Sequence, residues 1–383
     1  MKSNYKRLGD YIRQVDVRNK DLAVEKLLGL SIAKQFIPSI ANTIGTDMRN
    51  YKVVESRQFG YVPVTSRNGD KITIALYNDT EPCIISQAYT VFEVIDETKL
   101  LPEYLMMWFR RPEFDRYARF KSHGSAREVF EWEEMCDVML PIPPIEEQRK
   151  IVSEYQAIEQ RIENNRRLIA TLEATSQTIY RKMFVEDIDM GKLPEGWRMG
   201  TIGEYCKEMK SGGTPNRNHA EYWNKKDYPW LKTGEVQNNV IIKVEEYIST
   251  EGMKNSSAKL IPRDSVIMAM YGGGTVSNVA YLDCDTTTNQ ACCNMICYNK
   301  EDAAFLYFHL RHEQENIKRL ANGGAQENLS QDLIAKQPIP LFDDKGIKQI
   351  FVIILNQMRS KYKEINELTE LQSLLLAKMG QLK

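Results

Sequence analysis

The sequence predicts an α+β fold in which two mixed globular domains alternate with two long helices that pair as an antiparallel coiled coil. Three observations predict this architecture. A unit of about half the chain occurs twice, each copy ends in a heptad-like apolar pattern, and the rest of each copy mixes strand and helix patterns. At 383 residues the chain exceeds the usual size of a single hydrophobic core. Two or more domains are therefore expected.

The repeat consists of four pairs of short strings that occur in the same order in both halves of the chain. The partners lie 194, 199, 197 and 196 positions apart, which is too far for a solenoid, so a domain with its connecting helix is duplicated. The pairs are RLGDYI (7–12) with TIGEYC (201–206), HGSAREVF (123–130) with NGGAQENL (322–329), LPIPPIEEQRKIV (140–152) with QPIPLFDDKGIKQIF (337–351), and LEATSQTIYRKM (172–183) with LTELQSLLLAKM (368–379).

Each copy ends in a sequence that predicts a long helix. In the first copy, Glu146 and Glu147 follow the prolines and favour the positive end of a helix dipole. Apolar residues then recur about every 3.5 positions, which is typical of a coiled coil. The alternative is an amphipathic helix packed on its own domain. The two series are Ile151, Tyr155, Ile158, Ile162, Asn165, Ile169, Leu172, Ser176, Ile179 and Met183, and Phe351, Ile354, Met358, Lys361, Ile365, Leu368, Gln372, Leu375 and Met379.

The remainder of each copy mixes strands and helices. Alternating residues at 52–77 flank SRNGD, a hairpin signal, and 264–274 and 278–298 have the pattern of short strands. Helical patterns follow at 101–120 and 303–321, and the joint between the copies at 187–197 is rich in Gly, Pro and Asp. The predicted segments are a domain over 1–144, a helix over 145–186, a second domain over 187–341 and a helix over 342–383.

Charge is unevenly distributed, although the net charge is only −1. Residues 1–71 carry 13 Lys and Arg against 7 Asp and Glu, whereas residues 131–190 carry 7 against 13. The acidic middle segment suits a spacer or partner-binding element better than a DNA face. No long apolar run occurs and the start lacks a signal-peptide core, so we expect a cytosolic protein without a membrane span. The seven cysteines are expected to stay reduced.

Motifs with catalytic or metal-binding potential are incomplete. Cys292 and Cys293 would point to opposite faces of a strand, and no second ligand pair follows Cys297, so buried packing is favoured. His309 and His312 form H-x-x-H without the glutamate of a metalloprotease, which favours surface or hydrogen-bonded helical histidines. The glycines of 270–278 lack the Lys-Ser/Thr of a P-loop, and a tight turn is favoured over a phosphate site. No metal site is expected.

Several strings of the second copy occur in a specific order. SGGTPNRNHAEYW (211–223), PWLKTGEV (229–236), KNSSAKLIP (254–262), AMYGGGTVSNVA (269–280), TTNQACCN (287–294) and GGAQENLS (323–330) follow one another, preceded by LPEGW (193–197). This order, with LPIPPIEEQRKI (140–151) before the first helix, resembles the specificity subunits of Type I restriction–modification enzymes. The resemblance covers nearly the whole chain and is sharper in the second copy.

The resemblance implies a DNA-reading subunit without catalytic activity. In that family, two target recognition domains each read one half of a split DNA sequence, and two long helices hold them apart. The implied partners are double-stranded DNA, two modification subunits and restriction or translocase subunits, with no membrane. The implied cofactor, AdoMet, belongs to the modification subunit, and none is bound by this chain. The sequence contains no N-P-P-x or D-P-P-x tetrapeptide of an amino-methyltransferase, which agrees with methyl transfer by a partner.

Candidate DNA contacts are side chains suited to bases or phosphates. For each candidate the alternative is a solvated surface residue or a hydrogen bond that fixes a turn. Asn289, Gln290 and Gln326 favour scaffolding or phosphate contact, since the resemblance implies that their strings recur in members that read different sequences. The candidates are Lys34, Arg57, Gln58, Arg67, Asn68, Lys71, Ser125 and Arg127 in the first copy, and Ser211, Thr214, Arg217, Lys232, Thr233, Tyr271, Thr288, Asn289, Gln290 and Gln326 in the second.

The two copies differ in detail, and two other functions stay open. Arg127 stands where the second copy has Gln326, and 56–76 resembles a different type of recognition domain, so contacts do not transfer between copies. One alternative is the specificity part of a fused DNA methyltransferase, which methyl transfer by the purified chain would identify. The other is a helical protein-interaction adaptor, which would lack salt-dependent DNA binding.

Overall fold

The chain forms two compact units, each with its own sheets and helices. The computed structural model describes residues 5–39, 45–66, 69, 71–124, 127–189, 192–272, 274–321 and 328–381. Unit 1 comprises residues 1–161 and 368–383, and unit 2 comprises residues 162–367. Each long helix contributes one part to each unit. The predicted α+β class with two long helices is confirmed.

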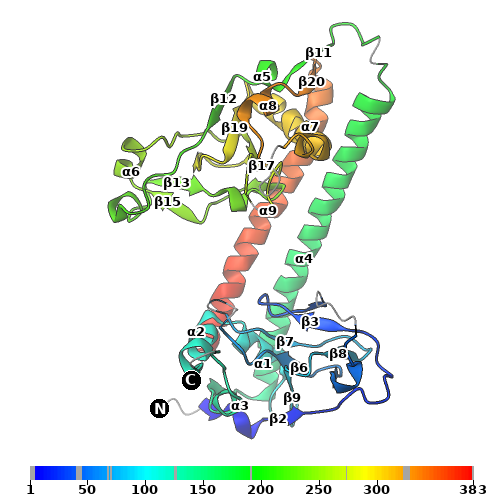
Figure 1. The fold of residues 1–383 in the computed structure, drawn as a ribbon, viewed down its shortest axis with the longest axis vertical. Helices are drawn as coiled ribbons and strands as arrows, with labels where there is room; N and C mark the ends of the chain where they lie inside the picture. Colours follow the sequence, from blue (N-terminus) through cyan, green and yellow to red (C-terminus); the bar gives the residue numbers. More distant parts are fainter. Residues whose placement is uncertain are drawn as a thin grey trace. The chain divides into compact units, whose positions relative to one another are not determined.

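Unit 1 is built on a four-stranded antiparallel sheet with the order β2-β9-β6-β7. Helix α1 (Pro102–Phe109) lies against this sheet (Figure 1). Phe59 stacks on Phe92 with ring centroids 4.7 Å apart, and Phe109 meets both rings edge-on. The strands are β2 (Ile12–Val15), β6 (Phe59–Tyr61), β7 (Ile74–Leu76) and β9 (Thr90–Val94), with smaller pairs of β3 (Leu28–Leu30) with β4 (Phe36–Pro38) and β5 (Lys52–Val54) with β8 (Cys83–Ile85).

Two predicted elements of unit 1 differ in detail from the structure. The predicted hairpin is present, because β6 and β7 pair antiparallel, but residues 52–54 join β8 in a separate sheet. The helix predicted over 101–120 is broken into α1 and α2 (Pro112–Lys121). Proline lacks an N–H group and disfavours helical geometry in the residue before it, so Pro112 starts a new helix instead of continuing α1.

Unit 2 contains a five-stranded mixed sheet with the order β12-β19-β16-β17-β14 and a three-stranded sheet with the order β15-β13-β18. Helix α7 (Lys300–Lys318) packs on β16 and β17. The other elements are β12 (Glu208–Ser211), β13 (Tyr228–Leu231), β14 (Asn239–Ile241), β15 (Glu246–Ile248), β16 (Val266–Ala269), β17 (Val279–Leu282), β18 (Thr287–Thr288), β19 (Cys292–Ile296) and α6 (Thr250–Lys254), with short 3-10 helices at Ala220–Tyr222 and Thr233–Glu235.

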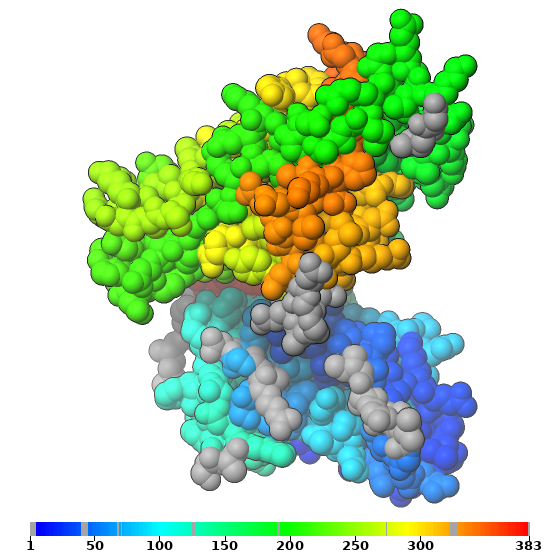
Figure 2. Space-filling view, turned by 45° about the horizontal axis from the view of Figure 1, so that its top comes forward, coloured from blue at the N-terminus to red at the C-terminus, as the bar shows by residue number. Residues whose placement is uncertain are grey.

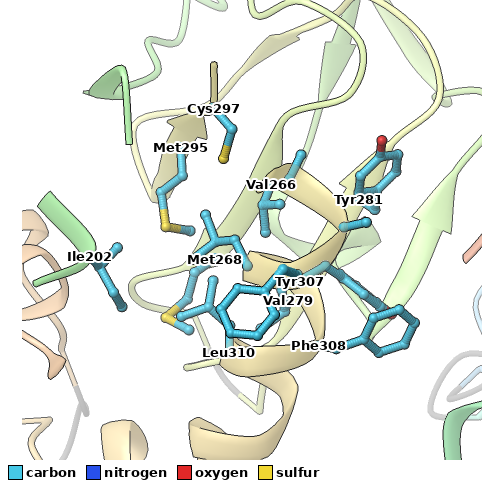
Figure 3. Close-up of a cluster of buried hydrophobic side chains, with 14 of the residues drawn as sticks. Ile202, Val266, Met268, Val279, Tyr281, Met295, Cys297, Tyr307, Phe308 and Leu310 are labelled. Carbon is cyan, nitrogen blue, oxygen red and sulfur yellow. The ribbon is translucent and has the colours of Figure 1, made fainter. Parts of the chain in front are cut away.

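The main core of unit 2 forms between the five-stranded sheet and α7. Figure 3 shows Met268 on β16 and Val279 on β17 beside Tyr307 and Leu310 of α7. All four side chains are fully buried. The strands predicted in 264–274 and 278–298 and the helix predicted over 303–321 are therefore present, and they position the loops at the ends of the strands.

The duplication is visible as the same clasp in both units. In unit 1, β1 (Tyr5–Arg7) pairs antiparallel with β10 (Met139–Pro141), and in unit 2, β11 (Arg198–Thr201) pairs in the same way with β20 (Pro338–Leu341). A short helix precedes the second strand of each clasp. These helices are α3 (Trp132–Cys136) and α8 (Gln331–Ala335), and the turns after the first strands are a 3-10 helix (Leu8–Asp10) and α5 (Ile202–Tyr205).

One glycine of the repeat sits at an equivalent close contact in both units. A Cβ on Gly9 would lie 2.8 Å from Cβ of Cys136, the last residue of α3. A Cβ on Gly203 would lie 3.3 Å from the carbonyl oxygen of Ala335, the last residue of α8. The Gly in RLGDYI and TIGEYC therefore allows the first turn of each domain to lie close to the last residue of the short helix, α3 or α8, that precedes the second clasp strand.

The two long helices pack against each other within each unit. α4 (Ile145–Arg181) ends in a π-helical turn, Lys182–Glu186, and α9 runs from Lys345 to Met379. In unit 1 the first turns of α4 share a core with the last turns of α9, whereas in unit 2 the second half of α4 meets the start of α9. The pairing is therefore antiparallel, and every residue of the two predicted heptad series is buried or half-buried. No helix of the described residues is long and apolar enough to cross a membrane.

Candidate nucleic-acid interface

A loop at residues 212–219 follows β12 of unit 2 and carries two of the predicted contacts. It starts with two glycines because neither position has room for a side chain. A Cβ on Gly212 would lie 2.2 Å from the Thr288 carbonyl oxygen, and one on Gly213 would lie 2.4 Å from the carbonyl carbon of Ser257. The Gly213 N–H donates to the Thr288 carbonyl oxygen at 2.8 Å. The Gly-Gly pair thus pins the start of the loop against β18.

Gln290 holds the same loop through Thr214, and Asn289 holds the 3-10 helix that begins at Thr233. The Asn289 Oδ1 accepts hydrogen bonds from the Thr233 hydroxyl at 2.8 Å and from the Ala291 N–H at 3.1 Å. The Gln290 Oε1 accepts a hydrogen bond from the Thr214 hydroxyl. These contacts fit the scaffolding alternative for Asn289 and Gln290, because they fix the positions of two segments that are far apart in the sequence.

Three further candidates of unit 2 lie inside the fold or at its edge. Thr288 is fully buried, and its hydroxyl accepts a hydrogen bond from Nδ2 of Asn294 at 2.9 Å. The Ser211 hydroxyl donates to Oε1 of Gln331 at 3.2 Å. Tyr271 is half-buried, and this burial raises the pKa of its hydroxyl. Thr288 and Ser211 therefore make internal hydrogen bonds in this structure.

Arg217 lies in a cluster of aromatic and charged side chains. Its guanidinium carbon is 3.5 Å from the centroid of the Trp223 ring and 4.8 Å from that of Trp230. Its Nη1 donates to Oε2 of Glu246 at 2.6 Å, and Nζ of Lys232 lies 3.1 Å from Oε1 of the same carboxylate. Burial acts to raise the pKa of Glu246, but the hydrogen bonds from Arg217 and Lys232 outweigh it and hold that pKa below its usual value. Two cations thus share one acidic partner.

This cluster belongs to the part of unit 2 formed by β13, β15 and α6. In Figure 1 these elements form the edge of unit 2 that is farthest from α9. In Figure 2 the same region, coloured green to yellow-green, lies at the surface. The strands and helix beside the Arg217 cluster therefore lie at the edge of unit 2 away from α9.

Two basic candidates of unit 1 are held by carboxylates of the same unit. Lys34 is 6% exposed, and its Nζ donates to Oδ1 of Asp115 at 2.8 Å. Burial lowers the pKa of Lys34, and Asp115 opposes this shift. Arg57 donates from Nε to Glu97 at 2.7 Å and from Nη1 and Nη2 to Glu103 at 2.6 and 3.2 Å. All the nitrogens of this guanidinium are engaged, so both side chains serve internal contacts in this structure.

The other candidates of unit 1 divide by exposure. Gln58 is buried, and its Nε2 donates to Oε2 of Glu93 at 2.9 Å. Lys71 and Arg127 are exposed. Three candidates of unit 1, Arg67, Asn68 and Ser125, lie outside the described residues, as does Gln326 of unit 2.

Cys292, Cys293 and His309 are buried and have packing roles. Cys292 and Cys293 are fully buried in two different clusters of unit 2, as expected for opposite faces of β19, and burial raises the pKa of Cys292 to about 12. His309 is not a surface residue but is buried beside Tyr180. Among the described residues, no group of three or more His, Cys, Asp or Glu is arranged to hold a metal ion.

Sequence reasoning missed Trp223, Trp230 and Glu246, which surround the candidate residue Arg217. Their relevance depends on contacts with Arg217 that bring together the 212–219 loop, β13 and β15. The sequence did contain a signal for this contact. Both tryptophans lie in the polar, charged segment that follows Arg217, and a cation such as arginine is a common partner for a tryptophan ring in such a segment.

The family model described as "Type I restriction modification DNA specificity domain" matches residues 40–174 and 194–375, one stretch in each copy of the repeat. The chain belongs to this family. It is a DNA-sequence-recognition subunit of the Type I restriction–modification class, which confirms the DNA-recognition role that the resemblance implied.

Several specificity subunits are similar to this one in sequence. The HindI specificity subunit of Haemophilus influenzae is 23% identical over 406 residues and is matched over 86% of both chains. The EcoR124I/EcoR124II specificity subunit of Escherichia coli is 27% identical over 173 residues, or 44% of this chain and 42% of the relative. The crystal structure of the Type I S subunit from M. genitalium is similar in fold, with a TM-score of 0.57, 14% identity, and coverage of 98% of this chain and 95% of that one.

Proposed function

We propose that unit 1 and unit 2 each read one half of a bipartite DNA target, and that α4 and α9 set the spacer between the halves. The observation that carries this proposal is the duplicated clasp, in which each domain closes with a two-stranded pair and continues into a long helix. A single contiguous target would need only one such domain. Two copies of the same domain provide two DNA-reading surfaces on one chain.

The lengths of the helices support a spacer role. α4 contains 37 residues and α9 contains 35. Helices of this length extend for about 50 Å, at about 1.5 Å per residue. One turn of B-DNA spans about 34 Å, so two domains carried by such helices would reach separate half-sites.

We propose that DNA contacts are made by the exposed basic candidates rather than by the buried ones. Lys71 and Arg127 in unit 1 and Arg217 in unit 2 are exposed, and the Lys232 side chain is 36% exposed. Basic side chains at the surface can replace the counterions of phosphates, and this gives salt-dependent binding. Lys34 is left out because its ammonium group would have to leave a buried carboxylate.

We also propose that methylation and cleavage are performed by partner subunits, with AdoMet on the modification subunits and none on this chain. Apolar side chains on the long helices support a docking role. Leu371 and Leu374 of α9 in unit 1 and Leu168 of α4 and Ile353 of α9 in unit 2 are exposed. Leu371 and Leu374 lie one helical turn apart, so together they present an apolar surface that a protein partner could cover.

An exchange of domains tests the reading of half-sites. Residues 1–144 are replaced by the matching domain of a specificity subunit with a different target, and the methylated sequence is determined by modified-base sequencing. One half of the motif should change and the other should stay, because unit 2 is untouched. A change in both halves would contradict the assignment of one domain to one half.

The exchange must preserve the packing of unit 1 on the helices. Val152 and Tyr155 of α4 and Leu376 and Met379 of α9 belong to the core of unit 1, so the donor residues at these positions are transferred with the domain. The matched control exchanges residues 187–341 instead, and the opposite half of the motif should then change.

A further inference from the structure

The Arg217 guanidinium is held between two indole rings at the surface of unit 2. Trp223 and Trp230 meet edge to face, with centroids 5.0 Å apart and planes at 89°. Arg217 stacks on both rings, yet its side chain is 50% exposed. The cation is therefore fixed in position while it remains accessible from solvent.

The backbone that carries Arg217 is fixed on both sides. Nε1 of Trp230 donates to the Gly213 carbonyl oxygen at 2.9 Å, and Nε1 of Trp223 donates to the Asn216 carbonyl oxygen at 3.3 Å. The Asn218 N–H donates to Oδ1 of Asn216 at 3.0 Å. The same two tryptophans thus hold both the loop and the guanidinium. Little freedom is left to lose on binding, and such preorganisation favours affinity.

The hydrogen-bonding state of Arg217 differs from that of Arg57. Every nitrogen of the Arg57 guanidinium is engaged with Glu97 or Glu103. Arg217 uses only Nη1, with Glu246, and its Nε and Nη2 make no hydrogen bond to any of the described residues. An exposed ion pair of this kind contributes little to stability. The pairing with Glu246 therefore does not by itself explain why a rigid arginine is displayed here with two further donors exposed.

We propose that Arg217 reads a guanine in the half of the target that unit 2 recognises. This inference rests on the proposed function and assigns one residue within it. Guanine presents two acceptors, O6 and N7, in the major groove, and the planar fork of an arginine matches them with two donors. The free donors of Arg217 suit this recognition, and Trp223 and Trp230 act as positioning residues that orient the fork.

The test measures discrimination at each position of the methylated motif. The full chain carrying Arg217→Gln is expressed with its modification subunits, and the methylated sequences are compared with those of the wild type. One G·C position in one half should relax, with discrimination there reduced by about tenfold or more. The other half should be unchanged.

Arg217→Lys separates base reading from phosphate contact and guards against misfolding. It keeps the charge and most of the stem but loses the two-donor fork, so the same G·C position should relax. A motif that stays intact with weaker binding at every site, restored by lysine, would identify a phosphate contact and overturn the proposal. An unchanged motif with unchanged affinity would also overturn it.

Two variants complete the design. Trp223→Ala should weaken discrimination at the same position although Arg217 is still present, and Trp223→Phe should largely restore it. Arg198→Gln removes an exposed arginine of unit 2 that pairs with Glu204 outside the loop, and it should leave the motif unchanged. A wild-type complex without a bipartite motif would refute the proposed function itself, whereas a bipartite motif insensitive to Arg217 would refute only this inference.

Discussion

His309 shows how a motif residue can be explained by packing. It lies on α7 with 2% of its surface exposed, and the Tyr180 hydroxyl of α4 shares a 2.6 Å hydrogen bond with its Nδ1. Burial lowers the pKa of His309 from 6.5 to about 3. The ring is therefore neutral at physiological pH and joins a recognition-domain helix to a long helix within unit 2.

This buried histidine predicts a pH dependence of the stability of unit 2. Below pH 6.5 the unfolded chain binds a proton at His309, whereas the folded chain does not until the pH approaches 3. The free energy of unfolding should therefore fall as the pH drops from 6.5, by about 1.4 kcal/mol per unit and about 2 kcal/mol by pH 5. Urea unfolding of wild type and His309→Gln at pH 7 and pH 5 measures this, and the variant should show a flatter dependence.

The matched control for this measurement is His219→Gln, which removes an exposed histidine of the same unit. The difference between the two variants isolates the buried ring. Equal pH dependence in wild type and His309→Gln would show that the ring is accessible to protons in the folded state.

Sequence reasoning selected plausible residue types for the interface but could not sort them. Lys34 pairs with Asp115 and Arg57 with Glu103, partners 81 and 46 residues away along the chain. No local pattern reveals such pairs, so both residues have the same sequence signature as an exposed cation. Arg217 was selected for its residue type, but its stacking on Trp223 depends on the fold of the loop.

The joint between each domain and its long helix occurs at the same position in both units but uses different chemistry. The fourth residue of α4, Gln148, is fully buried, and its Oε1 accepts from the Leu101 N–H at the start of α1 at 2.9 Å. The fourth residue of α9, Lys348, donates to Oδ1 of Asp302 in the first turn of α7 at 2.7 Å. Each long helix thus holds the beginning of the main helix of its domain.

Removal of the Gln148 amide should weaken the joint of unit 1. Gln148→Leu keeps the volume but leaves the Leu101 N–H unpaired, together with the carbonyl oxygens of Lys99 and Pro143 that accept from Nε2. The expected loss is about 2 kcal/mol in the free energy of unfolding, measured with urea. Lys150→Gln changes an exposed residue of the same helix and should stay within about 0.5 kcal/mol of the wild type. If Gln148→Leu proved as stable as this control, the joint would not depend on these hydrogen bonds.

The elements that sequence predicted best are those with a long periodic signal. The heptad series from Ile151 to Met183 places every member at a buried or half-buried position, because a sustained period leaves little ambiguity about the face. The pairing of short strands is harder to predict from the sequence. Residues 52–54 alternate as a hairpin strand should, yet they pair with 83–85, because strand partners are chosen by tertiary packing.

The duplicated architecture explains how a nearly neutral chain can have a DNA-reading role. The net charge is −1, so attraction to DNA has to come from local surfaces rather than from the molecule as a whole. The acidic excess lies in residues 131–190, which include α4, and exposed basic candidates lie on the domains. This distribution of charge fits a molecule in which the domains contact DNA phosphates and the long helices only support the domains.

If α4 and α9 set the spacer, their length should determine the distance between the two halves of the target. Deletion of one heptad from the middle of each helix removes about 10 Å of helix and keeps the apolar seam aligned, since seven residues are two full periods of the coiled coil. At about 3.4 Å per base pair, the spacer of the methylated motif should shorten by about three base pairs, while both half-sites keep their sequence. Modified-base sequencing reads both features at once. The control replaces the same heptads by other heptads of equal length and should leave the spacer unchanged. If the spacer length stays the same after the deletion, the distance between the half-sites is determined by the domains or by partner subunits and not by the helices.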